Sequence, residues 1–264
     1  STLERPVEWI RVNTQKSSAP VVAQKIGLHG ASILYDRYIE LPRDVGVKLL
    51  LALPEFVNGE FSFQNPSAFE VVKLLDLKPG LKVWDACAAP GGKSALMAEM
   101  DSSLDILASD SSANRLEKMQ DLMNRLGLTN VKTECIDVLA PRSEATSERS
   151  DLTPLFDRVL LDVPCSNMGV IARRPESVYR ITPESVKELS ELQYSILENA
   201  SKFLAEGGRL VYATCSPDPM ETTQVINRFL KAHPEFVKAG SAILPGKNDP
   251  RLDGFFAQAL EYKK

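Results

Sequence analysis

The stretch LKVWDACAAPGGKSALMAEM, residues 81–100, contains the unit from which the rest of the chain can be interpreted. Residues 81–87 form an apolar run typical of a buried strand, and residues 91–100 are expected to form a helix. Between them lie only small residues, with two glycines where the helix begins. A strand, a small-residue turn and a helix in this order are typical of α/β folds.

The same alternation continues to the end of the chain. Strands are predicted at 81–87, 104–110, 130–137, 157–165, 208–216 and 254–262, and helices at 69–77, 91–100, 113–127, 183–207 and 220–233. The last strand is expected at a sheet edge, and polar residues 141–151 are expected to form a solvated loop. Continuous apolar strands between amphipathic helices indicate a doubly wound, mostly parallel sheet.

Upstream of this alternation the pattern is different. A short strand is predicted at 7–14, a helix at 19–28 and a strand at 36–41, before residues 42–61 break the periodicity. The chain is therefore expected to begin with a small α+β segment, residues 1–65. The α/β domain then occupies residues 66–264.

Composition limits the class of protein. The 264 residues are 44% hydrophobic and 25% charged, which is typical of a globular protein, and the net charge of −4 argues against indiscriminate nucleic-acid binding. No run of about 18 apolar residues predicts a membrane span, and no secretory leader is recognisable. Cys87, Cys135, Cys165 and Cys215 form no CxxC pair, so we expect no metal site, no disulfide framework and a reducing, cytoplasmic location.

Chemically useful residues follow the predicted strands. In a parallel sheet, ligands bind at the carboxyl ends of the strands. Those ends carry acids and thiols, namely Asp85 to Cys87, Asp110, Asp137, Asp162 to Cys165, and Thr214 to Cys215. We therefore expect these side chains to face one crevice.

The first three strand ends suit a nucleoside that carries an amino-acid tail. Small residues before the helix allow a ligand to lie against backbone amides, which favour a carboxylate. Asp110 stands where an acid takes two ribose hydroxyls in dinucleotide folds, and Asp137 is placed to accept from an adenine amine. The alternative is that Asp85, Asp110 and Asp137 are ordinary cap or turn residues.

Three motifs in this order resemble a known family. DACAAPGGK (85–93), LLDVPCSNMGVI (160–171) and LVYATCS (210–216) closely resemble the RsmB/Sun family of RNA cytosine-5 methyltransferases, which use S-adenosylmethionine. The resemblance implies a Rossmann-like class I methyltransferase domain with a seven-stranded sheet, behind a small RNA-recognition segment. It also implies methyl transfer to C5 of a cytosine in RNA, with ribosomal RNA of the small subunit as the expected substrate and partner.

The resemblance also assigns roles to individual residues. It implies that the methionine part of the cofactor lies on the loop formed by Cys87, Ala88, Ala89, Pro90, Gly91, Gly92 and Lys93, and its nucleoside on Asp110 and Asp137. Asp162 faces both the methyl donor and the target base. Cys215 is the expected nucleophile, and Cys165 is expected to assist release of the product.

The two thiols fit the chemistry of cytosine. C5 is a poor nucleophile until a thiolate adds at C6, which is covalent catalysis. Cys165 and Cys215 end strands that should be neighbours, so their side chains should meet over one base. Open alternatives are two structural thiols, a redox disulfide, and exchanged roles in which Cys165 attacks. The "DVPC" sequence disfavours an N-methyltransferase.

RNA contacts are expected from Arg173 and Arg174, which follow the Cys165 loop. The sequence departs from the family in three places: Asn65 replaces an acid, "CIDVLA" lacks the usual glycines around the third-strand acid, and no NusB-like domain precedes residue 1. Transfer RNA remains an alternative substrate, and a non-catalytic assembly factor that binds ribosomal RNA remains an alternative function.

Overall fold

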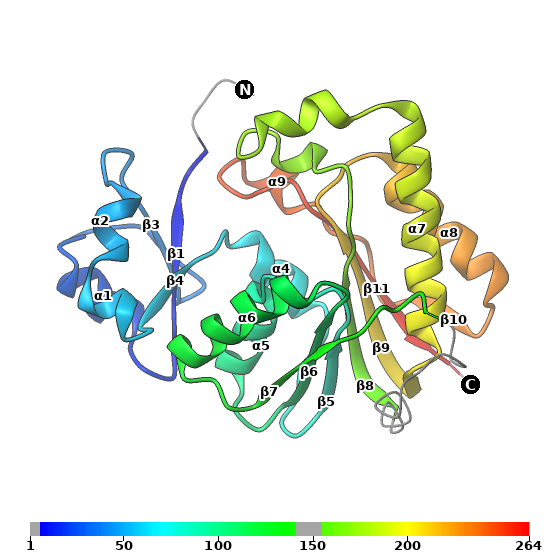
Figure 1. Cartoon of the computed structure of the whole chain (residues 1–264), viewed down its shortest axis with the longest axis horizontal. Helices are drawn as coiled ribbons and strands as arrows, with labels where there is room; N and C mark the ends of the chain where they lie inside the picture. The colour runs from blue at the N-terminus through cyan, green and yellow to red at the C-terminus, as the bar shows by residue number, and fades with distance from the viewer. Residues whose placement is uncertain (1–5, 141–154, 264) are drawn as a thin grey trace.

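The computed structural model describes residues 6–140 and 155–263, so the loop predicted at 141–151 lies outside the described residues. A four-stranded sheet close to the N-terminus stands beside a seven-stranded sheet that carries helices on both faces (Figure 1). The two sheets have separate apolar cores.

The seven-stranded sheet confirms the predicted doubly wound architecture. Its strands are β5 (Lys82–Asp85), β6 (Asp105–Asp110), β7 (Val131–Cys135), β8 (Phe156–Asp162), β9 (Leu204–Thr214), β10 (Phe236–Lys238) and β11 (Phe256–Tyr262), in the order β10-β11-β9-β8-β5-β6-β7. The strands from β5 to β9 pair in parallel, and β11 and β10 are antiparallel additions. The strand order reverses between β5 and β8, and such a switch point is where doubly wound sheets bind ligands.

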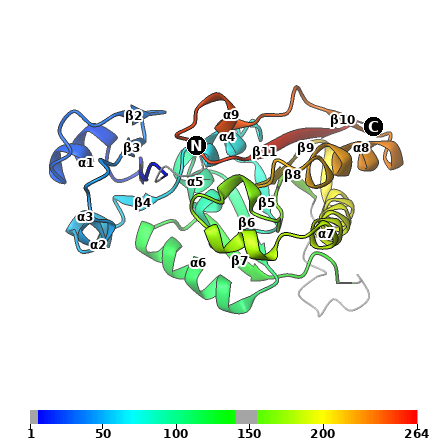
Figure 2. The same ribbon diagram turned by 90° about the horizontal axis from the view of Figure 1, so that it is seen from above.

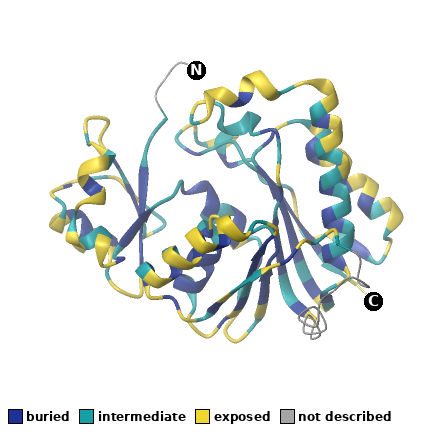
Figure 3. Cartoon of the chain, viewed as in Figure 1, coloured by how far each residue is buried: buried dark blue, intermediate teal, exposed yellow. Residues whose placement is uncertain are grey.

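The helices cover the two faces of this sheet in separate groups. Packed together over one face are α4 (Ser67–Lys73), α5 (Gly92–Met100) and α6 (Ala113–Leu126), and over the other lie α7 (Pro183–Ser201) and α8 (Thr223–Ala232) (Figures 1 and 2). Strand side chains alternate between the two cores: Val83 packs with the first group and Trp84 with the second. Figure 3 accordingly shows buried strands beneath helices that are exposed on their outer sides.

Two sequence expectations for the C-terminal half are wrong. The strand predicted at 254–262 is not at the edge, because the short strand β10 pairs along its outer side. The helix predicted at 183–207 ends at Ser201, although its N-terminus is as expected, with a reciprocal capping box between Thr182 and Ser185. Its last predicted turn joins β9 instead, because Leu204 is buried and pairs with Phe156 of β8.

The N-terminal segment is a small antiparallel sheet with three short helices. It consists of β1 (Trp9–Val12), α1 (Ala19–Lys25), β2 (Ile33–Leu34), β3 (Tyr38–Glu40), α2 (Val47–Leu51), α3 (Pro54–Val57) and β4 (Phe61–Phe63), with the strand order β2-β3-β1-β4. Strand β4 and helices α2 and α3 lie where the sequence periodicity is broken. The expected boundary at residues 65 and 66 falls between β4 and α4.

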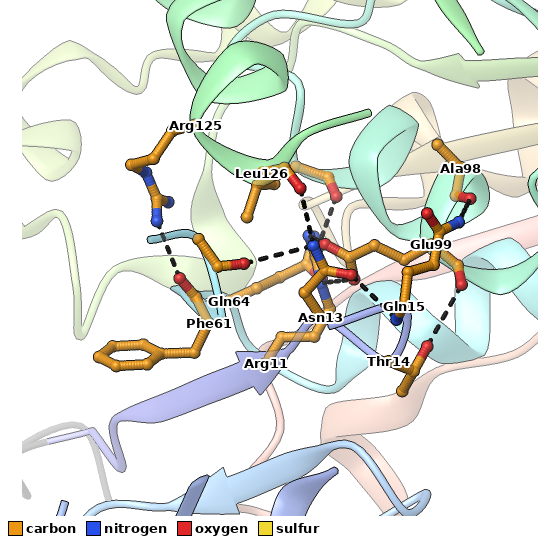
Figure 4. A network of polar contacts seen from close by, with 12 residues as sticks. Arg11, Asn13, Thr14, Gln15, Phe61, Gln64, Ala98, Glu99, Arg125 and Leu126 are labelled. Atoms are coloured by element: carbon orange, nitrogen blue, oxygen red, sulfur yellow. Dashed lines mark hydrogen bonds and ion pairs between the residues drawn. The ribbon is translucent and has the colours of Figure 1, made fainter. Parts of the chain in front are cut away.

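A buried ion pair joins this segment to the larger sheet domain. Arg11 of β1 donates from Nε and Nη2 to the carboxylate of Glu99 on α5, at 2.9 Å each, and both side chains are almost fully buried (Figure 4). Its Nη1 donates to the backbone carbonyl of Gly92 at 2.8 Å. Burial lowers the pKa of Arg11, but Glu99 and Tyr38 together outweigh burial and the pKa is raised. The small sheet is thereby fixed to both ends of α5.

Candidate functional site

The loop between β5 and α5 is built around a buried carboxylate. Asp85, at the end of β5, is 1% exposed and accepts a hydrogen bond from the Ser94 hydroxyl at 2.6 Å on Oδ2. Its Oδ1 has no hydrogen-bond partner among the described residues. Burial raises the pKa of Asp85 to about 7, against the opposing effect of Ser94. An unpartnered buried oxygen of this kind suits a cationic donor such as an ammonium group.

The glycine immediately before α5 is required by its surroundings. Gly91 has φ +96°, a conformation that side chains disfavour, and a Cβ there would lie 2.4 Å from Cγ of Met119. The loop therefore approaches α6 at a distance that only glycine allows. The rest of the predicted cofactor loop lines two cavities. Cys87 and Ala89 line one of 440 Å³, and Ala88, Pro90, Gly92 and Lys93 line one of 360 Å³, together with Asp85.

The larger cavity brings together acids from three successive strand ends. Asp110, Asp137 and Asp162 all line it, with apolar contacts from Ile136 and Ile196. Asp110 is buried, pairs with Arg115 at 2.7 Å and accepts from the backbone amide of Ser112 at 2.9 Å. Asp137 accepts from the amide of Leu139 at 2.9 Å. The cavity thus offers acceptors along its length and apolar walls between them.

Two cysteines converge in the same cavity from neighbouring strands. In the parallel pairing of β8 and β9, Asp162 stands opposite Ala213, so the segments that follow leave the sheet side by side. The Sγ atoms of Cys165 and Cys215 lie 2.6 Å apart, and both residues line the 440 Å³ cavity. Cys215 Sγ also donates to Oδ1 of Asn167 at 3.1 Å. The fold thus brings together two thiols that are 50 positions apart in the sequence.

The thiol pair favours one negative charge and opposes a second. The hydrogen bond from Cys215 lowers the pKa of Cys165, whereas the same contact, then burial, raises the pKa of Cys215. Because the sulfurs share one hydrogen bond, these opposite directions describe a pair that holds one negative charge, on Cys165, with Cys215 as the hydrogen-bond donor. Asp162 disfavours a thiolate on Cys215, and Lys93 favours it.

A lysine and an aromatic ring complete the centre of the site. Lys93 Nζ donates to Oδ2 of Asp162 at 2.5 Å and lies 4.7 Å from the ring centroid of Phe255. Burial lowers the pKa of Lys93, but Asp162, Asp85 and Cys215 together outweigh burial, so the pKa is raised. Asp162 and Phe255 line both the 440 Å³ and the 360 Å³ cavities. The two cavities therefore meet at this cluster.

Behind the thiols, a buried hydrogen-bond network joins the two cysteine loops. Glu221 is fully buried, and its carboxylate accepts from the Ser166 amide at 2.9 Å, the Ser166 hydroxyl at 2.5 Å and Gln193 Nε2 at 2.9 Å. Ser166 Oγ is 3.2 Å from Ser216 Oγ. Tyr212 donates to the Glu221 carbonyl at 2.7 Å. Glu221 thus holds Ser166 directly and Ser216 through Ser166, so it links the serines that follow the two cysteines.

The two arginines predicted to contact RNA have different surroundings. Arg173 is held within the protein: Nε donates to Asp253 at 2.6 Å, Nη1 to Glu8 at 3.0 Å, and Nη2 to the carbonyl of Val7 at 2.6 Å. Arg174 is exposed, lines the 440 Å³ and 360 Å³ cavities, and also lines a third cavity of 280 Å³. Only Arg174 of the two presents its guanidinium to the site.

Sequence reasoning missed Phe255 and Glu221. Phe255 reaches the site because Gly254 donates to the carbonyl of Gly169 at 3.1 Å, in contact with the Cys165 loop. A Cβ on Gly169 would lie 1.9 Å from the Gly254 oxygen. The available signal was the "DGFF" sequence at 253–256. Glu221 carries no local signal, because an acid near a helix start is usually a surface residue.

The described parts of the chain contain neither a metal-binding cluster nor a membrane-spanning helix. Across residues 6–140 and 155–263, no cluster of three or more His, Cys, Asp or Glu side chains could hold a metal ion. Within the same ranges, every helix is too short or too polar to cross a membrane.

The chain is similar to known RNA methyltransferases over most of its length. A family model described as 16S rRNA methyltransferase RsmB/F matches residues 72–259. Two curated relatives are the probable ribosomal RNA small subunit methyltransferase B of Bacillus subtilis (36% identical, covering 98% of this chain) and ribosomal RNA small subunit methyltransferase B of Shewanella oneidensis (35%, covering 97%). The chain spans 60% of the length of each. A solved methyltransferase homolog from Pyrococcus horikoshii is 26% identical, with TM-score 0.78, over 99% of this chain and 88% of its own.

Proposed function

Because the chain belongs to the RsmB/F family of 16S rRNA methyltransferases, we propose that it methylates C5 of a cytosine in small-subunit ribosomal RNA. The observation that carries this proposal is the 2.6 Å approach of Cys165 Sγ to Cys215 Sγ in a cavity that Asp162 also lines. Methyl transfer to an exocyclic amine needs no thiol, whereas C5 chemistry needs a nucleophile at C6.

The proposed cofactor is S-adenosylmethionine, and the residues present fit it. The unpartnered Oδ1 of Asp85 suits its ammonium group, Asp110 its ribose hydroxyls and Asp137 its adenine amine. The loop from Cys87 to Lys93 would hold the methionine part. When bound, S-adenosylmethionine supplies an electrophilic methyl group.

In the proposed reaction, the Cys215 thiolate adds to C6 of cytosine, and the new Sγ–C6 bond converts the ring into an enamine. C5 then accepts the methyl group. With Cys215 held in the adduct, the Cys165 thiol releases its proton to water, and the resulting thiolate takes the C5 proton. The C5–H electron pair restores the C5–C6 double bond as the Sγ–C6 bond breaks. The thiolate is returned and the atoms balance.

Asp162 and Lys93 have complementary roles in this proposal. The Asp162 carboxylate accepts from the N4 amine and favours a protonated N3, which withdraws electrons from C6. Lys93 neutralises Asp162 and favours a thiolate on Cys215, because its ammonium group is buried beside both. The Cys165 thiolate accepts the Cys215 proton as Cys215 Sγ attacks C6, so the pair supplies one nucleophile and one proton-transfer group.

For RNA contact we propose Arg174, since the donors of Arg173 are already bonded within the protein. We also retain residues 1–65 as an RNA-recognition segment and 66–264 as the catalytic domain. The buried Arg11–Glu99 pair supports a fixed orientation of the two, since it joins β1 to the helix that follows the cofactor loop.

The test is methyl transfer from tritiated S-adenosylmethionine to 16S rRNA and to total tRNA, followed by bisulfite sequencing. We expect label in 16S rRNA at bisulfite-resistant cytosines, and loss of label in Cys215→Ala. The exposed Cys135 provides a matched control, and Cys135→Ala should be fully active. Label in tRNA alone would show that tRNA, and not 16S rRNA, is the substrate. Cofactor binding without methyl transfer to either RNA would favour a non-catalytic assembly factor.

A further inference from the structure

A third cavity adjoins the cysteine site and is not used by the proposed reaction. It measures 280 Å³ and shares Cys165, Asn167 and Arg174 with the 440 Å³ cavity. We call it the flanking pocket; its other walls include Glu176, Ser177 and Arg180 of the 3₁₀ helix Pro175–Arg180. Because the two cavities share three residues, a polymer with one unit over the thiols can place its neighbouring unit in the flanking pocket.

The flanking pocket carries positive charge suited to phosphate. Arg174 and Arg180 are exposed, and neither side chain forms a hydrogen bond or ion pair with another residue of the described ranges. Glu176 is the acid among the lining residues. The chain as a whole has net charge −4, so two unpaired arginines beside one cavity are a local feature. Local potential of this sign attracts a nucleic-acid backbone.

An aromatic side chain stands on the same helix. Tyr179 is 90% exposed, so it contributes little to the core. In a 3₁₀ helix the side chains at i and i+3 eclipse one another, which places Tyr179 on the side of Glu176, one turn further along. Tyr179 does not itself line the flanking pocket, and its ring lies in solvent beside the wall that Glu176 forms. Exposed aromatic rings beside basic groups are platforms on which unpaired bases stack.

We propose that the flanking pocket binds the nucleotide next to the target cytosine in single-stranded RNA. Arg174 and Arg180 contact its phosphates, Tyr179 stacks on its base, and the Glu176 carboxylate accepts from a base amino group. This inference rests on the proposed function only in taking RNA as the substrate. It adds a subsite that fixes the strand while the target base is turned into the cysteine site.

The experiment measures binding and turnover separately. A fluorescein-labelled single-stranded RNA of twelve nucleotides with one central cytosine is titrated with the 264-residue chain, and Kd is read by anisotropy at several salt concentrations. Tyr179→Ala should weaken binding about 5- to 150-fold, which corresponds to about 1–3 kcal/mol per stacked base. Tyr179→Phe keeps the ring and should bind like the unmodified chain. Arg180→Gln should reduce the salt dependence by about one phosphate contact.

Matched controls and turnover separate this inference from the proposed function. Lys231→Gln removes one exposed positive charge on α8, away from the flanking pocket, and should leave Kd unchanged. In methylation of 16S rRNA, Tyr179→Ala should raise KM with little change in kcat. If Tyr179→Ala and Arg180→Gln both bind the oligonucleotide within twofold of the unmodified chain, the subsite is wrong whether or not the chain methylates. If the unmodified chain binds but does not methylate, the proposed function fails and the binding comparison still decides the subsite.

Discussion

The buried carboxylate of Glu221 should determine whether the two thiols meet. It accepts three hydrogen bonds, two from Ser166 and one from Gln193, and no solvent reaches it. Replacement by Ala would leave three buried donors unsatisfied at about 1–3 kcal/mol each, a loss that approaches the whole stability of a typical domain. Glu221→Gln is the informative change, because it keeps the volume and one carbonyl oxygen.

For Glu221→Gln we expect a loss of about 1–3 kcal/mol in the free energy of unfolding, since charge-assisted hydrogen bonds become neutral ones. We also expect kcat for RNA methylation to fall by about 100-fold, the usual effect of a 1 Å displacement of reacting groups. The KM for RNA should not change, because Glu221 lines none of the three cavities described above.

The assays are urea denaturation followed by circular dichroism, and initial rates with tritiated cofactor. Glu188→Gln, an exposed acid on α7, is the matched control and should change neither quantity. Stability and kcat within experimental error of the unmodified chain would refute the assignment of Glu221 as the anchor of both loops. A loss of stability with unchanged kcat would limit its role to folding.

Three further predictions concern the frame of the site. Glu99→Ala should cost about 3–5 kcal/mol of unfolding free energy by leaving the Arg11 charge buried and unpaired, as measured by urea denaturation. Gly91→Ala should weaken S-adenosylmethionine binding by at least tenfold in calorimetry, because its Cβ would displace Met119 and strain the loop. The pKa of Asp85 is about 7 in the folded chain, whereas the unfolded chain loses this proton near pH 4. Ionisation of Asp85 therefore lowers the free energy of unfolding as the pH rises from about 4 to 7. The stability of Asp85→Asn relative to the unmodified chain should increase from pH 5 to pH 7.5, as measured by urea denaturation.

Each of these predictions has a contradicting result. A Glu99→Ala variant as stable as the exposed-site variant Glu117→Ala would show that the ion pair does not join the two parts. Unchanged cofactor affinity in Gly91→Ala would mean that α6 yields to the added methyl group. A stability difference for Asp85→Asn that is constant with pH would mean that Asp85 is ionised in both states.

Much of the fold could be predicted because local pattern and topology agree. Apolar strands alternate with helices from residue 81 onward, and the carboxyl-end rule for parallel sheets is independent of loop length. This rule predicted one shared crevice for Asp110, Asp137, Asp162 and both cysteines, and all five residues line the 440 Å³ cavity. The prediction failed where pairing overrides local preference, as at Leu204, which leaves a helical pattern to enter β9.

The parts of the site that the sequence did not predict depend on contacts between distant segments. Phe255 arrives through the close approach of Gly169 and Gly254, and Arg173 is occupied by Glu8 and Asp253. No spacing rule encodes such pairings, because each joins loops or chain ends whose relative position only the assembled sheet defines.

The roles of the two sulfurs are tested most directly by covalent trapping on RNA that contains 5-fluorocytidine. Fluorine at C5 cannot leave as a proton would, so the adduct between the nucleophilic Sγ and C6 persists and migrates as a protein–RNA band on a denaturing gel. With S-adenosylmethionine present, the unmodified chain, Cys135→Ala and Cys165→Ala should form this band, and Cys215→Ala should not. A band that persists in Cys215→Ala and disappears in Cys165→Ala would exchange the two roles, and no band from any variant that methylates RNA would contradict covalent catalysis altogether.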